Sequence, residues 1–461
     1  MATTVQSIPR VSKLDAPGPP GHFLLGNVRE LKQDLLGTFS TWRKEYGDIV
    51  RYRVASRQQH LITHPELVRE IFVHGRQIFD RPGQDEPLRG LRLVINTGLL
   101  GANGTFWLRQ RRMMQPIFHR RRIAKMAQAM TDCGEQMLAR WATYDPTQPI
   151  DLSKEMMAVT LDIISQTMFG AEVMEHVDEV EKALQIALRF AFDSIQKALF
   201  VPLRWPTPRN REFKQALKTL DEIVYRIIAQ RRASRGEHDD LLAMLLEARD
   251  EESGEGMDDK QLRHEVLTIF GAGHETTANA LTWTWYLLAQ HPKILQRLQN
   301  ELKEVLAGRT PTLKDLRNLP YCKQVLEEAM RLYPPAPILG RYVRQSTALN
   351  GYHIPSNSVV VTSIYNVHRH PDFWSEPEKF DPGRFAPEKK QEHHRYAYMP
   401  FGAGQHLCIG NQFALMEGQL LLAQMAQKYE LRLVPEHAIE KEVAITLRPR
   451  YGMKMTLHPI N

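Results

Sequence analysis

The residues of this chain best suited to chemistry lie around Cys408, in the segment FGAGQHLCIG at residues 401–410. Apolar residues at helical spacing follow it, from Phe413 to Leu421, so the segment predicts a loop that ends where a helix begins. Backbone N–H groups and the positive end of the helix dipole favour a thiolate over a thiol at such a position. A thiolate there acts as a nucleophile or as a metal ligand.

The neighbours of Cys408 narrow that choice. Phe401 offers a flat apolar surface, and His406 adds a hydrogen-bond donor or a cation. Gly404 and Gly410 allow the backbone to come close to a bound group. This combination suits a cysteine that is the axial ligand of heme iron. The alternative is a buried cysteine in a glycine-rich turn.

The pattern F-x-x-G-x-H-x-C-x-G resembles the heme-binding signature of the cytochrome P-450 superfamily, in its soluble bacterial type. The resemblance implies that Cys408 is the thiolate ligand of heme b, and that Phe401, Gly402 and Gly410 contact the cofactor. Most members have arginine at the position of His406, and histidine is a known variant there. The departure therefore concerns a contact to a heme propionate and not the ligation of iron.

A second motif, GAGHETT at residues 271–277, lies inside a long helical pattern. Two glycines within a helix cost about 1 kcal/mol each relative to alanine, which suggests close approach of a flat ligand and local opening of the helix. The motif is similar to the oxygen-activation motif of the same superfamily. The resemblance implies that Glu275 and Thr276 supply protons and that Ala272 and Gly273 contact heme. The alternative is a kinked core helix with a surface glutamate.

Glu328 and Arg331 are spaced to form an ion pair on one helix face, and such pairs are common on helix surfaces. The proline-rich segment 332–337 and the segment FDPGRF at residues 380–385 follow. Together these are similar to the E-x-x-R helix and the P-x-R-F segment of the superfamily. The resemblance implies a buried charge network of Glu328, Arg331 and Arg384 that holds the loop before Cys408.

Further cofactor contacts are implied by the same resemblance. Trp107 and Arg111 are four residues apart and share one helix face. With Arg341 and His406 they are expected to donate hydrogen bonds to the two heme propionates. For each residue alone, the alternative is a solvated surface side chain.

The expected substrate pocket is mostly apolar. By resemblance, its lining residues are Leu91, Val94, Ile95, Phe270, Ile338, Leu339, Thr446 and Leu447. An apolar pocket favours a lipid-like substrate, so we expect a fatty acid first and a terpenoid or steroid second. The same residues would also fit an ordinary protein core.

The elements that must position these residues are mainly helical. The pattern from Asp258 to His291 predicts one long helix that ends before Pro292, and residues 443–457 predict a terminal hairpin around residues 450–452. The resemblance implies a mainly α protein with a small β lobe (α+β), in which the long helix crosses the domain over heme. It implies a flexible segment over residues 1–16 and a single domain over 17–461, with a β-rich lobe from about 45–65, 340–365 and 440–458.

Composition places limits on the class of protein. Hydrophobic residues make up 43% of the chain and charged residues 25%, as in globular proteins with a large core. Three isolated cysteines argue against a disulfide framework and for a reducing compartment. Residues 1–16 are polar and lack the apolar run of about 20 residues that a membrane span needs. We therefore expect a soluble, cytoplasmic bacterial protein without a transmembrane anchor.

The formal net charge of the chain is +7, and one stretch concentrates it without any acidic residue. The resemblance places this stretch on the proximal side of heme, where it would attract an acidic ferredoxin or flavodoxin that is served by its own reductase. The alternative is an ordinary charged helix, and no nucleic-acid reader motif accompanies the charge. The basic residues are Arg109, Arg111, Arg112, Arg120, Arg121, Arg122 and Lys125.

The resemblance covers residues 17–457 through five ordered motifs and predicts a heme-thiolate monooxygenase. Such an enzyme uses dioxygen and two electrons from NAD(P)H, delivered through a redox partner, to hydroxylate or epoxidise an apolar molecule. We expect a monomer. A peroxide-driven or rearranging heme-thiolate enzyme is one alternative, against which the intact Glu275–Thr276 pair argues. A non-catalytic heme sensor is the other.

Overall fold

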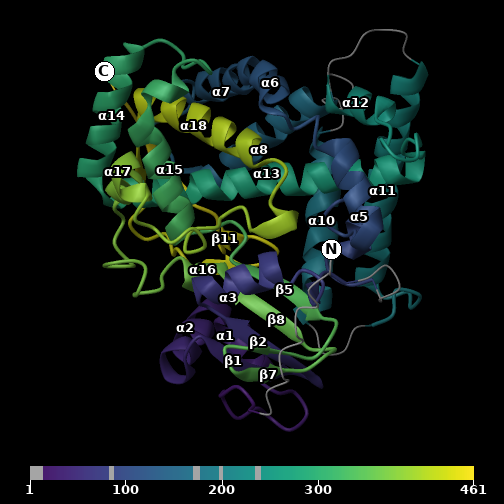
Figure 1. The fold of residues 1–461 in the computed structure, drawn as a ribbon. Helices are drawn as coiled ribbons and strands as arrows, with labels where there is room; N and C mark the ends of the chain where they lie inside the picture. Colours follow the sequence, from purple (N-terminus) through teal and green to yellow (C-terminus); the bar gives the residue numbers. More distant parts are fainter. Residues whose placement is uncertain (1–13, 83–87, 170–176, 197–200, 234–239, 461) are drawn as a thin grey trace, which may run out of the picture. The chain divides into compact units, whose positions relative to one another are not determined.

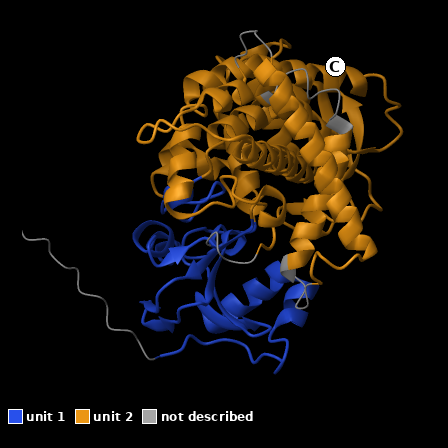
Figure 2. Ribbon diagram, turned by 90° about the vertical axis from the view of Figure 1, so that its right-hand side faces the viewer, with its two compact units in different colours: residues 1–82, 337–378, 393–407 blue, residues 83–336, 379–392, 408–461 orange. Residues whose placement is uncertain are grey.

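The computed structural model describes residues 14–82, 88–169, 177–196, 201–233 and 240–460. The chain forms two compact units, shown in blue and orange in Figure 2. Unit 1 comprises residues 1–82, 337–378 and 393–407, and unit 2 comprises residues 83–336, 379–392 and 408–461. The segments of the two units alternate along the chain, and the boundary between the last two falls directly before Cys408.

Unit 1 contains the small β lobe. Its five-stranded sheet has the order β1-β2-β8-β5-β3, in which β2 and β8 are parallel and the other neighbours are antiparallel. Its elements are α1 (Val28–Gln33), α2 (Leu35–Tyr46), β1 (Ile49–Val54), β2 (Arg57–Ile62), α3 (Pro65–Arg69), the π-helical η1 (Glu70–His74), β3 (Phe79–Asp80), β5 (Ile338–Val343), β6 (Thr347–Leu349), β7 (Tyr352–Ile354), β8 (Val359–Ser363), α16 (Ile364–Val367) and the 3-10 turn η6 (Gly404–His406).

Alternation along the strands gives this sheet two buried faces. Val360 and Val361 of β8 point to opposite sides, so they belong to different apolar clusters. One cluster includes Phe39 and Trp42 of α2, and the other includes Ile71 of η1. Because both faces are covered, the sheet forms a rigid support for the loops that leave it.

The N-terminal segment was expected to be flexible over residues 1–16, and residues 1–13 lie outside the described part. Residues 14–16 are held in place, which corrects the prediction for them. The Asp15 carboxylate pairs with Arg51 at 2.8 Å, and Ala16 is buried in the core of unit 1. Strand pairing between Asp15 and His353 fixes the backbone there.

Unit 2 is mainly helical and is organised around the long helix α13 (Figure 1). Its elements are α4 (Arg92–Ile95), α5 (Gly104–Met114), α6 (Arg120–Ile123), η2 (Ala124–Met126), α7 (Ala127–Trp141), β4 (Ile150–Asp151), α8 (Leu152–Ile164), η3 (Ser165–Phe169), α10 (Val177–Gln196), α11 (Pro208–Ala233), α12 (Leu241–Glu247), α13 (Asp259–Gln290), α14 (Pro292–Leu306), η4 (Leu316–Asn318), α15 (Pro320–Leu332), η5 (Pro382–Phe385), α17 (Pro387–Lys390), α18 (Asn411–Lys428), β9 (Tyr429–Leu433), β10 (Lys441–Val443), β11 (Leu447–Pro449) and β12 (Lys454–Pro459).

Helix α13 confirms the long helix predicted from the sequence. Its 32 residues begin after Asp258, whose carboxylate caps the first turn by accepting a hydrogen bond from the backbone N–H of Gln261. It ends where Pro292 opens α14. Helices α8, α11, α15 and α18 pack against it, so α13 forms the centre of unit 2.

The C-terminal strands differ from the prediction. Residues 443–457 do not form one hairpin, because β11 pairs with β10 whereas β12 pairs with β9 and β4. These strands belong to two small sheets in unit 2, so residues 440–458 are not part of the five-stranded lobe as expected. The alternating pattern of these residues indicated strands but could not indicate their partners.

None of the described helices combines the length and hydropathy that a membrane span requires.

Candidate active site

Cys408 differs from the other two cysteines in its surroundings. Cys133 and Cys322 are buried, as predicted, and burial raises the pKa of the Cys133 thiol to about 12. Cys408 is accessible. Burial of the sulfur against the surrounding protein raises the pKa of the Cys408 thiol overall, and the backbone N–H of Gly410 and the guanidinium of Arg111 oppose that rise. A reachable thiol with these two neighbours is suited to bind a metal as a thiolate.

The segment after Cys408 forms the predicted loop and helix. Helix α18 begins at Asn411, three residues beyond the cysteine, with Gly410 at its cap. A side chain at Gly410 would have its Cβ 4.0 Å from Phe118. The stretch that precedes α6 therefore lies beside the cysteine loop within unit 2.

Helix α13 has a small accessible area in an otherwise buried stretch. Gly271, Ala272, Gly273 and Thr276 are partly accessible, whereas residues 261–270 and 277–285 are all buried. A Cβ at Gly271 would meet no atom within 4 Å. This stretch of α13 is thus left partly uncovered between two buried stretches, as contact with a flat cofactor or its substrate would need.

The local opening expected in this motif is not present, because α13 is continuous through residues 271–277. The Thr276 hydroxyl donates to the carbonyl of Ala272 at 2.8 Å, which leaves its oxygen able to accept. Gly273 has a packing reason to be glycine, since a Cβ there would lie 2.5 Å from the Cδ1 atom of Ile164 on α8. Gly273 thus lets α8 pack closely on one side of α13, and Gly271 leaves another side of α13 uncovered.

Glu275 is buried and is not a surface glutamate. Its Oε1 atom accepts a hydrogen bond of 2.6 Å from the hydroxyl of Thr446, in the turn between β10 and β11. Asn279, one helical turn after Glu275, donates to the same hydroxyl at 3.1 Å. Thr446 was expected in the substrate pocket, and Asn279 was not among the expected site residues. The spacing of four between Glu275 and Asn279, which puts both on one face of the helix, could have indicated Asn279.

The charge pair at Glu328 and Arg331 is fully buried. Arg331 donates through Nε and Nη2 to the two carboxylate oxygens of Glu328, at 2.7 and 2.9 Å. Arg384 approaches the same carboxylate at 3.4 Å, and the backbone N–H of Asp381 donates to it at 2.9 Å. Arg331 also donates to the carbonyl of Lys379 at 3.1 Å. Helix α15 is thereby joined to the segment around η5.

Four expected cofactor residues lie in unit 1, within the sheet and the loop before Cys408. Arg341 of β5 is buried, stacks at 4.5 Å on the ring of Phe72, and has its pKa lowered to about 10 by burial. Burial also lowers the pKa of His406 to about 4, so its imidazole is neutral near pH 7. Phe401 and Gly402 are partly buried in the same loop.

Trp107 and Arg111 occupy one face of α5 in unit 2. Trp107 is buried, and burial lowers the pKa of Arg111 while the nearby Cys408 raises it. Burying a cation is costly unless an anion compensates it. The half-buried Arg111 and the buried Arg341 each have the chemistry of a propionate partner, and Cys408 has that of an iron ligand. Cys408 and Arg111 of unit 2 therefore fit the iron and a propionate of heme, and Arg341 of unit 1 fits a propionate.

The expected pocket residues divide between the two units. In unit 2, Val94, Ile95, Phe270 and Leu447 are buried, Leu91 is partly buried, and α4 packs against α13. In unit 1, Ile338 and Leu339 are partly buried and pack on the two clusters of the sheet.

A buried carboxyl group ties the segment after α4 to α13. Glu265 accepts from the backbone N–H of Leu99 at 2.9 Å and from the Gln261 amide at 2.6 Å, and burial raises its pKa to about 7. A carboxyl with a raised pKa contributes stability below the unfolded pKa of 4.5, and that stability is lost as pH rises through about 7.

We expect the unfolding free energy of the wild type to fall on the order of 3 kcal/mol relative to Glu265→Gln between about pH 4.5 and 7. Chemical denaturation of both proteins across that range measures the difference. Burial raises the pKa of Glu417 on α18 to about 8, so only the comparison with the variant isolates Glu265. A difference that does not change with pH would contradict the assignment.

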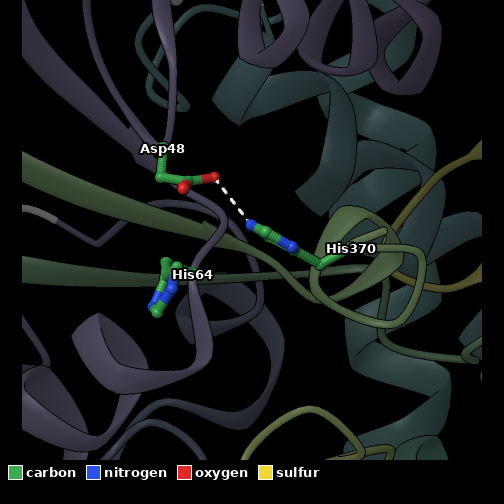
Figure 3. Close-up of side chains that lie close together, drawn as sticks. All are labelled: Asp48, His64 and His370. Atoms are coloured by element: carbon green, nitrogen blue, oxygen red, sulfur yellow. Dashed lines mark hydrogen bonds and ion pairs between the residues drawn. The ribbon is translucent and has the colours of Figure 1, made fainter. Parts of the chain in front are cut away.

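A second group of possible metal ligands lies in unit 1 (Figure 3). One ligand atom each of Asp48, His64 and His370 lies within 4.8 Å of the others. Each is already engaged: His370 pairs with Asp48 at 3.2 Å, Thr63 donates to Asp48 at 2.7 Å, and His64 accepts from the backbone N–H of Glu66. The group is explained by these hydrogen bonds, and we assign it no metal.

The family model "Cytochrome P450" matches residues 16–456. The chain is 36% identical to cyclooctat-9-en-7-ol 5-monooxygenase of Streptomyces melanosporofaciens, over 87% of this chain and 88% of that protein. It is 33% identical to pentalenene oxygenase of Streptomyces avermitilis, over 85% and 86%. The crystal structure of the cytochrome P450DA heme domain has a TM-score of 0.88 at 26% identity, covering 98% of this chain and 99% of that one.

The chain belongs to the cytochrome P450 family. It is a cytochrome P450 monooxygenase, with the mainly α fold and small β lobe of that family. The family membership implies heme, iron and the use of dioxygen, as the cysteine loop and the GAGHETT motif predicted.

Proposed function

We propose that this monooxygenase hydroxylates or epoxidises a cyclic terpenoid, with Cys408 as the heme ligand and Glu275 and Thr276 as the proton donors. The observation that carries the proposal is the accessible Cys408 thiol beside Arg111 and Gly410, in the unit whose central helix has the accessible area at 271–276. When bound, heme supplies the activation of dioxygen and the transfer of one oxygen atom.

The roles of the protein groups follow from their atoms. Cys408 Sγ would bind the iron, and Arg111 would stabilise the negative charge of the thiolate. The Thr276 hydroxyl donates to the carbonyl of Ala272, and its oxygen can accept a hydrogen bond from a water molecule on its accessible side. Glu275, the residue before Thr276 on α13, is the group that exchanges protons with that hydroxyl. Arg341 and His406 are proposed to bind the propionates, His406 as a neutral donor.

The substrate class rests on relatives and on the apolar candidate pocket. The names of two relatives contain the compounds cyclooctat-9-en-7-ol and pentalenene, which are terpenoids. Val94, Ile95 and Phe270 are apolar, as contact with a hydrocarbon skeleton requires, and the names of the two relatives decide between the substrate classes. This favours a terpenoid over the fatty acid that the sequence analysis placed first, and the fatty acid remains the alternative.

Turnover with an added redox system tests this function. Purified protein, NAD(P)H, a bacterial ferredoxin and its reductase are incubated with cyclic terpenes or fatty acids, and products are identified by mass spectrometry. We expect an oxygenated terpene that contains one atom from labelled dioxygen. Product formed with hydrogen peroxide but never with NAD(P)H would favour the peroxide-driven alternative. The cytoplasmic location and the monomeric state stay predictions.

The basic stretch proposed for the redox partner is smaller than the sequence suggested. Arg109 pairs with Glu255 at 3.1 Å, and Arg112 pairs with Asp250 at 3.1 Å and with Glu252. The remaining exposed cations cluster at α6, which packs on α18, the helix that follows Cys408. These residues, the α6 patch, are Arg120, Arg121, Arg122 and Lys125.

Reversing charge in the α6 patch is expected to slow reduction of the heme. In Arg120→Glu/Arg121→Glu, repulsion should reduce the rate with an acidic ferredoxin about tenfold at low salt and little at high salt. Stopped-flow reduction measures this rate, and Arg211→Glu/Lys214→Glu on α11 makes the same charge change elsewhere as a control. An unchanged rate in the α6 variant would remove the docking proposal.

A further inference from the structure

The turn between β10 and β11 contacts one face of α13 through three buried side chains. Glu275, Asn279 and Trp283 are spaced by four residues and so share that face. Glu275 and Asn279 both hydrogen-bond the Thr446 hydroxyl, and Trp283 Nε1 donates to the carbonyl of Leu447 at 3.0 Å. A polar contact between distant segments therefore sits beside the motif that supplies protons.

The turn is held from several sides. Val443 and Leu447 pair across the hairpin, and the backbone N–H of Leu447 donates to the carbonyl of Pro335 at 2.9 Å. Trp283, which binds the Leu447 carbonyl, stacks on Tyr333 with ring centroids 4.2 Å apart. Because this backbone is fixed, the Thr446 hydroxyl has a defined position relative to α13.

The direction of the hydrogen bonds determines which oxygen of Glu275 is occupied. Asn279 donates to Thr446 Oγ1, and Thr446 uses its single proton to donate to Glu275 Oε1. Oε1 is thus an acceptor, and Oε2 is the oxygen left to carry or exchange a proton. Among the described residues, no arginine or lysine forms an ion pair with Glu275, so the hydroxyl is its principal anchor.

We propose that Thr446 is a positioning residue that, oriented by Asn279, holds Glu275 with Oε2 free for proton exchange during oxygen activation. This inference rests on the proposed function. It gives the Thr446 hydroxyl, which is buried against Glu275 and Asn279, a role other than the expected lining of the substrate pocket.

The test compares two substitutions at this position with a matched control. Thr446→Val keeps the shape of the side chain and removes the hydroxyl, and Thr446→Ser restores the hydroxyl. Thr282→Val removes another buried hydroxyl of α13, whose described bond goes to its own helix at Ala278. The readouts are heme content, the dissociation constant for substrate from the Soret shift, and the product formed per NAD(P)H consumed. Crystal structures of the variants locate the Glu275 carboxylate.

For Thr446→Val we expect unchanged heme content and substrate affinity, a Glu275 carboxylate that leaves its position, and about tenfold less product per NAD(P)H. Thr446→Ser and Thr282→Val should behave as the wild type. In the Glu275→Gln background, Thr446→Val should have no further effect, because the two residues act as one unit.

Two results would overturn the inference: wild-type coupling in Thr446→Val, or an effect on substrate affinity alone, as a pocket residue would give. Both results require a wild-type protein that forms product under the same conditions. If the wild type itself consumes NAD(P)H without oxygenating any tested substrate, the proposed function fails, and the crystal structures still decide whether Thr446 positions Glu275.

Discussion

Arg331→Ala is expected to give protein that lacks bound heme. The substitution leaves the Glu328 carboxylate fully buried without its bidentate partner, and Arg384 approaches only one oxygen at 3.4 Å. Burial raises the pKa of Glu328 even with Arg331 present. Breaking a buried pair by removing one partner costs about 3–5 kcal/mol. The link from α15 through the Lys379 carbonyl to the segment around η5 is lost as well.

Heme content per protein and the thermal unfolding midpoint measure this effect. Arg69→Ala is a matched control, since Arg69 and Glu66 form a pair with the same spacing of three and their side chains are exposed. Exposed pairs contribute about 0–1 kcal/mol, so the control should retain heme and stability. An Arg331→Ala protein that is fully loaded with heme and as stable as the wild type would refute the structural role of the network.

Thr276→Ala should bind heme and substrate normally but lose most of the coupling between NAD(P)H and product. The hydroxyl lies in the accessible area of α13, and its bond to Ala272 is local, so little stability depends on it. Positioned proton donors contribute about 10²–10⁴ in rate, and we expect product per NAD(P)H to fall by at least about tenfold. Reduced oxygen should then be released as hydrogen peroxide.

Simultaneous measurement of NAD(P)H, product and hydrogen peroxide provides the test. Thr284→Ala is the control, because Thr284 makes the same kind of bond to its own helix, at Ala280, but is buried. Thr276→Ser should recover coupling. Full coupling in Thr276→Ala would show that the hydroxyl is not part of proton delivery.

Local spacing made part of this protein readable from its sequence. The loop and helix around Cys408, the long helix from Asp258, and the pair at Glu328 and Arg331 are each written in a short stretch of chain. The signal for the first is a glycine-rich loop before apolar residues at helical spacing. The signal for the second is a capped helical period of apolar residues, and for the third it is two opposite charges three residues apart. The structure has all three, and the comparisons show the family that they indicated.

Contacts between distant segments could not be read in the same way. Thr446 and Glu275 are 171 residues apart, and neither position has a local pattern that points to the other. Arg112 finds its acidic partners 138 and 140 residues away, so a stretch that looks purely basic is partly neutralised. The prediction of a terminal hairpin was wrong for the same reason, since the alternation of apolar and polar residues indicates a strand but not the strand that pairs with it.

A Soret titration of the purified protein tests whether Cys408 binds heme and whether cyclic terpenes bind beside it. The ferric protein is titrated with cyclic terpene hydrocarbons and, in parallel, with fatty acids and steroids. We expect a Soret band that Cys408→Ala abolishes or shifts, and a low- to high-spin change with cyclic terpenes at lower concentrations than with fatty acids. A protein that carries no Soret band after expression with ample heme supply would contradict the assignment of Cys408 as a heme ligand.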